Sequence, residues 1–281
     1  MNAEPRITFV MSAFNAENTI AKAVEYTLNQ TVPELELIVF DDGSTDGTAA
    51  VLAGIRDGRL RILRSGHNVG RAAGRDACIR AARAEVIAIA DADDLSMPHR
   101  ALHHLAVLAQ HPDAQITFGA LRCVNSVGTA LPAPGFPVLG SDVDQAFHRG
   151  QMGIAHPASA FRRRWYAETG GYDRALRWCE DYDLFARGHR PGITIPDPAV
   201  LVEYASPGAV RPWNYWWQSE RHRRAINARI ARHGPRDALS HDPAPFLRAV
   251  SGPHHRLQEY LRWLLVSARD TARTAHISAP A

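Results

Sequence analysis

The sequence is almost without lysine. Lys22 is the only one, so arginine supplies nearly all of the 32 basic residues. A planar guanidinium suits phosphate recognition, but a compositionally biased genome gives the same pattern, and we favour that explanation. Cysteine is also scarce: Cys78, Cys123 and Cys179 are odd in number and widely spaced. They form neither a zinc motif nor a disulfide framework, which favours a reducing compartment.

Long apolar runs are lacking too. No stretch approaches the about 18 apolar residues of a membrane-spanning helix, and Met1–Ile7 has no apolar signal region. We therefore predict a cytoplasmic protein. The formal net charge is only +3, and 46% hydrophobic with 22% charged residues is an ordinary globular composition. A chain of 281 residues is long enough to bury a full core.

Carboxylates follow two strongly apolar segments. Ile87–Asp94 reads Ile-Ala-Ile-Ala-Asp-Ala-Asp-Asp, and Leu35–Asp42 likewise ends in two aspartates. Carboxylates this close together repel one another unless a cation or hydrogen-bond donors face them. An Asp-x-Asp at a strand end suits a hard divalent ion that takes its other ligands from water and a phosphorylated substrate. The alternative is a turn or a helix N-cap, where aspartate is also common.

The alternation of apolar and amphipathic segments predicts an α/β fold. A first strand at Arg6–Met11 precedes a helical pattern at Glu17–Asn29, which Asn15 is placed to cap, and further helices are expected at 48–55, 74–82 and 98–110. Such βα units build a mostly parallel, twisted sheet. Ligands bind at the carboxyl ends of its strands, where the strand order reverses. We expect the acidic strand ends to meet there.

Several motifs follow one another in a characteristic order. They are Thr8–Glu17, Leu37–Thr48, Asn68–Asp76, Ala90–Asp94, Gly170–Asp173 and Cys179–Leu184. Together they resemble glycosyltransferase family 2, a large group of inverting enzymes with the GT-A fold; the last two resemble its Gly-Gly-Phe-Asp turn and Glu-Asp catalytic motif. The resemblance extends from about Ile7 to about Tyr204.

This resemblance implies a Rossmann-like, mostly parallel sheet flanked by helices. Residues 5–115 would form the nucleotide-sugar-binding half, 116–205 the acceptor-binding and catalytic half, and 206–281 a helical extension. The implied activity transfers a sugar from a nucleotide-diphosphate sugar to a saccharide, lipid-linked or other hydroxyl acceptor in cell-surface glycan synthesis. We expect the donor nucleotide to be UDP. The alternative is a non-catalytic nucleotide- or carbohydrate-binding protein with a GT-A-like fold, which would need no base.

The resemblance also assigns residues to the donor. Ser12 and Phe14 would lie near the base, Asp42 would bind its edge, and Arg71 or Arg75 would contact the base or the phosphates. For the arginines, a solvated helix face is the alternative.

The metal belongs, by the same resemblance, to the acidic turn. Asp93 is the expected direct ligand of Mn2+ or Mg2+, which sequence does not separate. Asp91 would contact the ribose or a metal-bound water. We expect Asp94 to cap the following helix.

The expected catalytic base is Asp181. An inverting displacement needs a carboxylate within hydrogen-bond reach of the acceptor hydroxyl, and the resemblance gives this role to the Asp of the Glu-Asp pair. Glu180 would orient the acceptor or its loop, Trp178 would stack on a sugar ring, and His156 would lie near the diphosphate. Acids at a helix N-terminus and a buried structural histidine are the alternatives.

The tail from residue 206 resembles nothing we can name. Arginines and aromatic residues mix in Arg211–Ile230, and apolar stripes follow in Phe246–Val250 and Leu257–Val266. We favour helices that pack back on the catalytic part. Contact with a membrane surface is the alternative. No nucleic-acid-binding motif accompanies the mixture, so we expect no nucleic-acid partner. The sequence does not indicate an oligomeric state.

Overall fold

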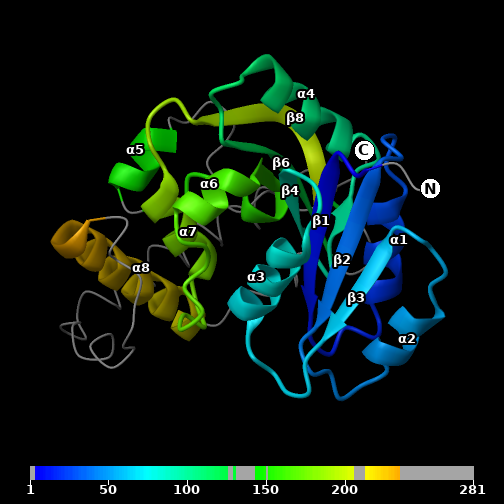
Figure 1. The fold of residues 1–281 in the computed structure, drawn as a ribbon. Coiled ribbons are helices and arrows are strands. Elements are labelled where there is room, and N and C mark those ends of the chain that lie inside the picture. The colour runs from blue at the N-terminus through cyan, green and yellow to red at the C-terminus, as the bar shows by residue number, and fades with distance from the viewer. Residues whose placement is uncertain (1–3, 126–128, 131–142, 150, 206–212, 235–281) are drawn as a thin grey trace, which may run out of the picture.

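The computed structural model describes residues 4–125, 129–130, 143–149, 151–205 and 213–234 (Figure 1). Its strands are β1 (Ile7–Ala13), β2 (Leu35–Asp41), β3 (Leu60–Arg64), β4 (Val86–Asp91), β5 (Leu95–Ser96), β6 (Ile116–Val124), β7 (Ser159–Arg162) and β8 (Thr194–Ala205). Its helices are α1 (Ile20–Leu28), α2 (Thr48–Gly54), α3 (Arg71–Ala81), α4 (Arg100–Gln110), α5 (Val143–His148), α6 (Arg163–Glu168), α7 (Glu180–Gly188) and α8 (Trp213–His233), with a 3-10 turn at His156–Ala158.

The strands form one sheet in the order β3-β2-β1-β4-β7-β6-β8-β5. The first four in this order are parallel, as the βα alternation predicts. β7 runs antiparallel to both β4 and β6, whereas β8 is parallel to β6 and antiparallel to β5. The α/β fold expected from the sequence is therefore confirmed, and every antiparallel pair includes β7 or β8.

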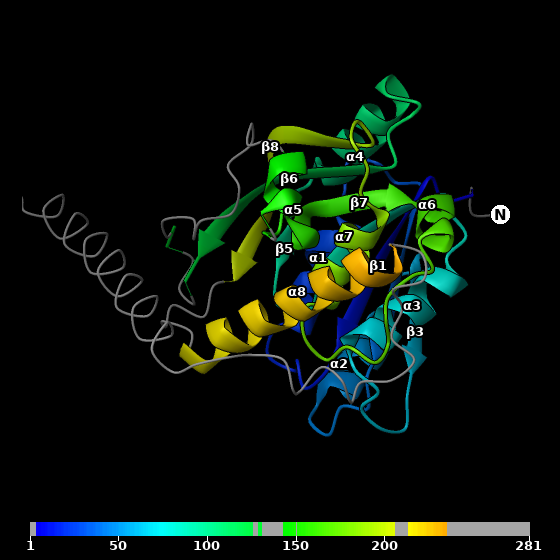
Figure 2. The ribbon, with the colours of Figure 1, turned by 90° about the vertical axis from the view of Figure 1, so that its left-hand side faces the viewer.

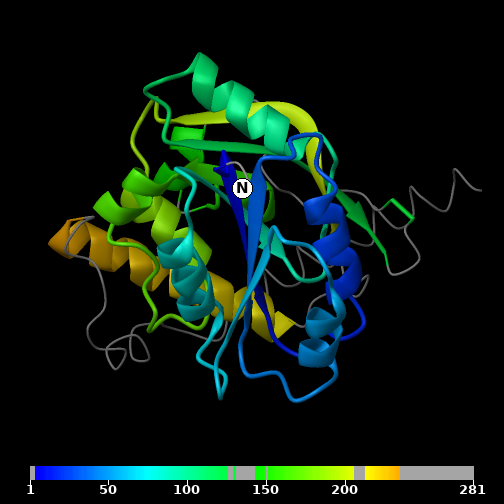
Figure 3. The same ribbon diagram turned by 45° about the vertical axis from the view of Figure 1, so that its right-hand side comes forward.

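Helices cover both faces of the sheet. α3 lies on one face of β1 and β2, and α1 and α2 lie on the opposite face (Figure 3). Alternate residues of β1 serve the two layers: Val10 is buried with Ile38 and Ile79 on the α3 side, while Phe9 packs with Val24 on the other. Because side chains alternate along a strand, a strand buried on both faces is mostly apolar, as β1 is apart from Thr8 and Ser12.

The parallel strands bring the motif residues to one edge. In the strand register, Ser12 of β1 lies opposite Asp91 of β4, and Ala13 lies opposite Asp41 of β2. β1 has β2 on one side and β4 on the other, so the strand order reverses here. The two acidic strand ends therefore lie at the same edge, on either side of β1, where α/β sheets bind ligands.

One expected helix cap is wrong. α1 begins at Ile20 with Thr19 at its N-cap, and no side chain caps it. Asn15 instead adopts a left-handed backbone conformation, with φ of 50°. Its Oδ1 accepts a hydrogen bond from the Thr45 amide at 2.9 Å. The carboxamide therefore joins the turn after β1 to the turn after β2, an alternative that local sequence does not reveal.

Part of the tail packs against the catalytic half. α8 runs alongside α7 (Figure 2), and Ile226 of α8 is fully buried with Leu176 and Tyr182. The packing that we favoured for the tail thus holds for α8. Phe246–Val250 and Leu257–Val266 lie outside the described residues. Among the described helices, none combines the length and apolar character needed to cross a membrane.

Candidate active site

A close approach of α3 to the sheet shapes the site. A Cβ at Gly74 would lie 2.7 Å from Ser12 Oγ and 2.8 Å from Phe40 Cδ1, so only glycine allows this packing. The packing places Arg71 and Arg75, one turn of helix apart, beside the strand ends. Sequence reading missed this role of Gly74 because it depends on residues from two other elements.

Arg75 is the central side chain. Its buried guanidinium donates from Nη2 to Asp91 Oδ1 at 2.6 Å and from Nη1 to Glu180 Oε1 at 3.1 Å. Arg71 approaches the same oxygen, with Nε at 3.4 Å. Asp91 ends β4, whereas Glu180 begins α7. One arginine therefore connects the acidic strand end to the Glu-Asp pair, so the alternative of a solvated helix face is wrong for Arg75.

Asp42 is engaged by the loop that leads into α3. Its carboxylate is 1% exposed and accepts hydrogen bonds from the amides of Val69 at 2.6 Å and Gly70 at 2.9 Å. Gly70 needs its φ of 95°, a region that disfavours other residues. Each carboxylate oxygen keeps a further lone pair. The structure thus shows Asp42 fixing the loop before Arg71, a function that the sequence did not suggest.

Phe14 and Ser12 stand at the end of β1. The Phe14 ring is 47% exposed in the turn after the strand, which leaves an aromatic face for stacking. Ser12 Oγ is buried and has no hydrogen-bond partner among the described residues.

The acidic turn contains three different environments. The Asp91 side chain is 21% exposed and bonded to Arg75, while Asp93 is exposed. Asp94 is buried, and its Oδ1 accepts a hydrogen bond from the Ala205 amide at 2.9 Å. Asp94 does not cap α4, whose N-cap residue is His99, because it holds the end of β8 instead. Burial and the charges of its two neighbours raise the pKa of Asp94 to about 8.

The acidic turn fits a divalent ion only with help from a ligand. Among the described residues, no group of three or more His, Cys, Asp or Glu side chains is placed to hold a metal. One oxygen of Asp91 already accepts a hydrogen bond from Arg75. Asp91 and the exposed Asp93 therefore offer the metal at most two protein ligands. This donor set suits a hard cation that retains waters and binds substrate phosphates.

Asp181 has the properties of a base. It is the second residue of α7, and its Oδ1 accepts a hydrogen bond from the Tyr182 amide at 2.8 Å. Burial and the neighbouring charge of Glu180 raise its pKa to about 6, against the opposing effects of that amide, Arg75 and Arg71. A raised pKa makes the carboxylate a stronger base, which favours general-base catalysis.

The turn before α7 has a strained backbone. Cys179 is in the left-handed region, with φ of 58°, although it is not a glycine. Strain of this kind collects at functional sites. Trp178, proposed to stack on a sugar, is half-buried in the same turn. No sequence signal marked Cys179.

His156 is buried and shares a hydrogen bond of 2.8 Å between its Nε2 and the Tyr172 hydroxyl. Burial and the Arg75 charge hold its pKa well below the usual value, so the imidazole is neutral. These contacts match the structural alternative. Tyr172 itself follows the Gly170-Gly171 turn and packs edge-on against Tyr166.

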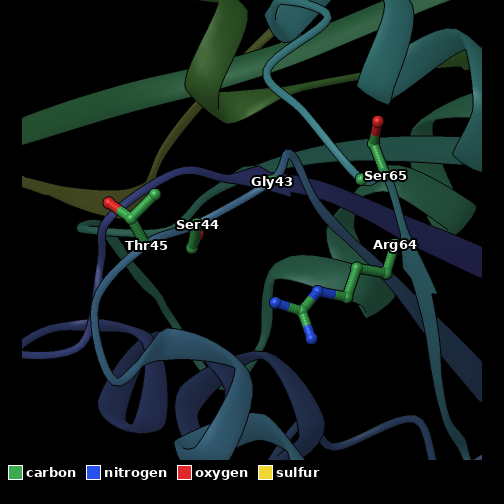
Figure 4. A pocket seen from close by; sticks show the side chains of 6 residues that line it. Gly43, Ser44, Thr45, Arg64 and Ser65 are labelled. Atoms are coloured by element: carbon green, nitrogen blue, oxygen red, sulfur yellow. The ribbon is translucent and has the colours of Figure 1, made fainter.

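A shallow pocket of about 330 Å³ opens near the ends of β2 and β3 (Figure 4). It is lined by Gly43, Ser44, Thr45, Arg64, Ser65 and Gly66. Arg64 Nε lies 3.1 Å from Asp41 Oδ2 at its edge. No predicted site residue lines this pocket, and we do not assign the chemistry to it.

Comparison with known proteins identifies the family to which this α/β fold belongs. The sequence profile of glycosyl transferase family 2 matches residues 8–170. The chain belongs to glycosyltransferase family 2. The Glu180–Asp181 pair lies beyond the matched segment.

Two curated relatives are similar over most of the chain. The succinoglycan biosynthesis protein ExoO of Rhizobium meliloti is 33% identical over 192 residues, 65% of this chain and 55% of ExoO. The putative glycosyltransferase EpsE of Bacillus subtilis is 29% identical over 205 residues, 69% of this chain and 70% of EpsE. The chain thus spans little more than half of ExoO.

A solved structure shares the fold. The crystal structure of S. aureus TarS 1-349 in complex with UDP has a TM-score of 0.60 and 16% identity, covering 79% of this chain and 65% of that one. This likeness confirms the GT-A fold predicted from the sequence.

Proposed function

We propose that this chain is an inverting glycosyltransferase that moves a sugar from a nucleotide-diphosphate sugar to an acceptor hydroxyl. One observation carries the proposal: Arg75 joins Asp91, on the donor side, to Glu180, which adjoins a carboxylate with a pKa of about 6. A protein that only binds carbohydrate has no use for such a base. UDP in the TarS complex supports a UDP-linked donor, and the name of ExoO supports an acceptor in polysaccharide synthesis.

The donor is held by the ends of the first strands. Phe14 stacks on the base, Ser12 lies near it, and Asp42 reaches the base edge through its remaining lone pairs while fixing the loop before Arg71. The half-exposed Arg71 side chain pairs with the diphosphate. Arg75, buried between Asp91 and Glu180, holds the donor side and the acceptor side at a fixed position relative to each other.

Asp93 and Asp91 would hold the divalent ion, Mn2+ or Mg2+. When bound, that ion neutralises charge on the departing diphosphate. Asp181 accepts the proton of the acceptor hydroxyl as the oxygen attacks the anomeric carbon from the face opposite the leaving group. Glu180 holds the start of α7 to Arg75, and Trp178 offers a face to the acceptor sugar.

Thermal unfolding separates this proposal from a lectin-like function. UDP with Mn2+ should raise the melting temperature, because a ligand at about 100 times its Kd adds about 2.7 kcal/mol to stability. Asp93→Ala should lose the metal-dependent part of this rise, since the diphosphate charge is then left without its cation. Asp113→Ala, which alters an exposed aspartate before β6, is the matched control. An unchanged metal-dependent rise in Asp93→Ala contradicts the metal assignment.

A further inference from the structure

Helix α8 holds the two residues that flank the Glu180–Asp181 pair. Cys179 Sγ donates a hydrogen bond to the Ser219 carbonyl, with 3.5 Å between sulfur and oxygen. The Tyr182 hydroxyl donates to Asn227 Oδ1 at 2.8 Å. The catalytic pair therefore lies between two side chains that are fixed from the same neighbouring helix. α8 also lies outside the segment that matches the family profile.

Arg229 adds a charged contact two residues beyond Asn227. Its guanidinium is 11% exposed and donates from Nη1 to Asp173 Oδ2 at 2.9 Å and from Nη2 to Asp183 Oδ1. Asp183 belongs to α7, whereas Asp173 ends the Gly-Gly turn. One buried arginine of α8 thus joins the two motifs that surround the candidate base, and charge-assisted bonds of this kind are strong and directional.

We propose that α8 positions the catalytic base, with Arg229 as the principal positioning residue. The inference rests on the proposed function, because it gives α8 a part in the work of Asp181. Arg229 acts by holding the first turn of α7 through Asp183. A displacement of about 1 Å in a reacting group can cost about 100-fold in rate, so a helix that fixes this turn affects turnover directly.

Removal of Arg229 should leave the rest of the fold in place. Asp183 keeps a second arginine, because Arg187 Nη2 lies 2.7 Å from its Oδ2. Arg187 also donates to the carbonyls of Thr169 and Gly171, which ties α7 to the Gly-Gly turn without α8. The loss of Arg229 therefore releases α8 and leaves Asp183 paired with Arg187, while the buried Asp173 loses this charged partner and keeps the Ala175 amide.

The test compares Arg229→Met with Arg229→Lys and with Arg224→Met. Arg224 is a matched control on α8, since its side chain is 58% exposed and pairs with Glu220 of the same helix. Arg229→Met should lower kcat by about 10- to 100-fold with an unchanged donor KM, as expected for a misplaced base. Lysine should restore part of kcat, and Arg224→Met should match the wild type.

Hydrogen exchange supplies a readout that does not depend on activity. Amides 180–184 should exchange faster in Arg229→Met than in the wild type, while UDP and Mn2+ still raise the melting temperature. A variant with a lower melting temperature but wild-type kcat would reduce α8 to a structural element and overturn the proposal. If the wild type transfers no sugar, the proposed function fails. If hydrogen exchange of amides 180–184 is unchanged in Arg229→Met, the proposal that Arg229 holds α7 is overturned independently of the activity.

Discussion

Asp181→Asn is expected to lower kcat by about 100-fold or more, the usual scale for loss of a general base. Asparagine keeps nearly the same shape and can still accept a hydrogen bond from the Tyr182 amide, but it cannot take the proton of the acceptor hydroxyl. Donor binding should survive, because the nucleotide and metal residues lie on other segments. The variant should therefore still gain thermal stability from UDP with Mn2+, and a transfer assay beside that melt separates the two effects.

Glu180→Gln is the matched comparison. Glutamine keeps an oxygen for Arg75, so turnover should fall less, and the effect should be mainly on the apparent affinity for the acceptor. The Glu180 charge raises the pKa of Asp181. Wild-type kcat/KM should thus rise with pH through about 6, the pKa of Asp181, and Glu180→Gln should move this rise to lower pH. If Glu180→Gln were inactive and Asp181→Asn active, Glu180 would be the base and Asp181 the supporting residue. If both variants kept their activity, the two acids would only stabilise the N-terminus of α7, and the base would lie elsewhere.

Arg75→Leu is expected to cost both activity and stability. It leaves Glu180 and Asp91 without their shared partner, and breaking a buried ion pair typically costs about 3–5 kcal/mol. The lower end applies here, because the Asp91 side chain is 21% exposed and Arg71 still approaches Glu180. Denaturant midpoints and kcat measured on the same preparations report the two losses.

Arg80→Leu is the control for that variant, since Arg80 lies on the same helix with its side chain 69% exposed and pairs with Asp76. Arg75→Lys should recover more stability than activity, because an ammonium group is a point charge that lacks the fork needed to bridge two carboxylates. An Arg75→Leu variant with wild-type stability and turnover would contradict the claim that Arg75 links the donor side to the acceptor side.

The sequence predicts the edge of the sheet well because that edge follows from local pattern. Apolar runs that end in acids set β2 and β4, and parallel βα units must place such ends together. This is why Asp41 and Asp91 lie at the same edge, on either side of β1. Element type and order come from periodicity within each segment, which needs no knowledge of distant residues.

The failures share another cause. Asn15 and Asp94 are typical capping residues, and each bonds instead to an amide that lies 30 or 111 positions away in sequence. The Arg75–Glu180 pair has a separation of 105 residues. Such contacts depend on how whole elements dock, so a capping preference of about 1 kcal/mol is easily outweighed. Family resemblance supplied the Glu-Asp pair; its surroundings came only from the structure.

The stereochemistry of transfer tests the central claim most directly. The wild-type protein is incubated with a panel of α-linked nucleotide sugars and simple acceptors, and NMR follows the anomeric coupling of the first product, including any sugar slowly transferred to water. A single carboxylate base without a covalent nucleophile predicts a β-configured product. An α-configured product, or no turnover of any donor in the panel, would contradict the account.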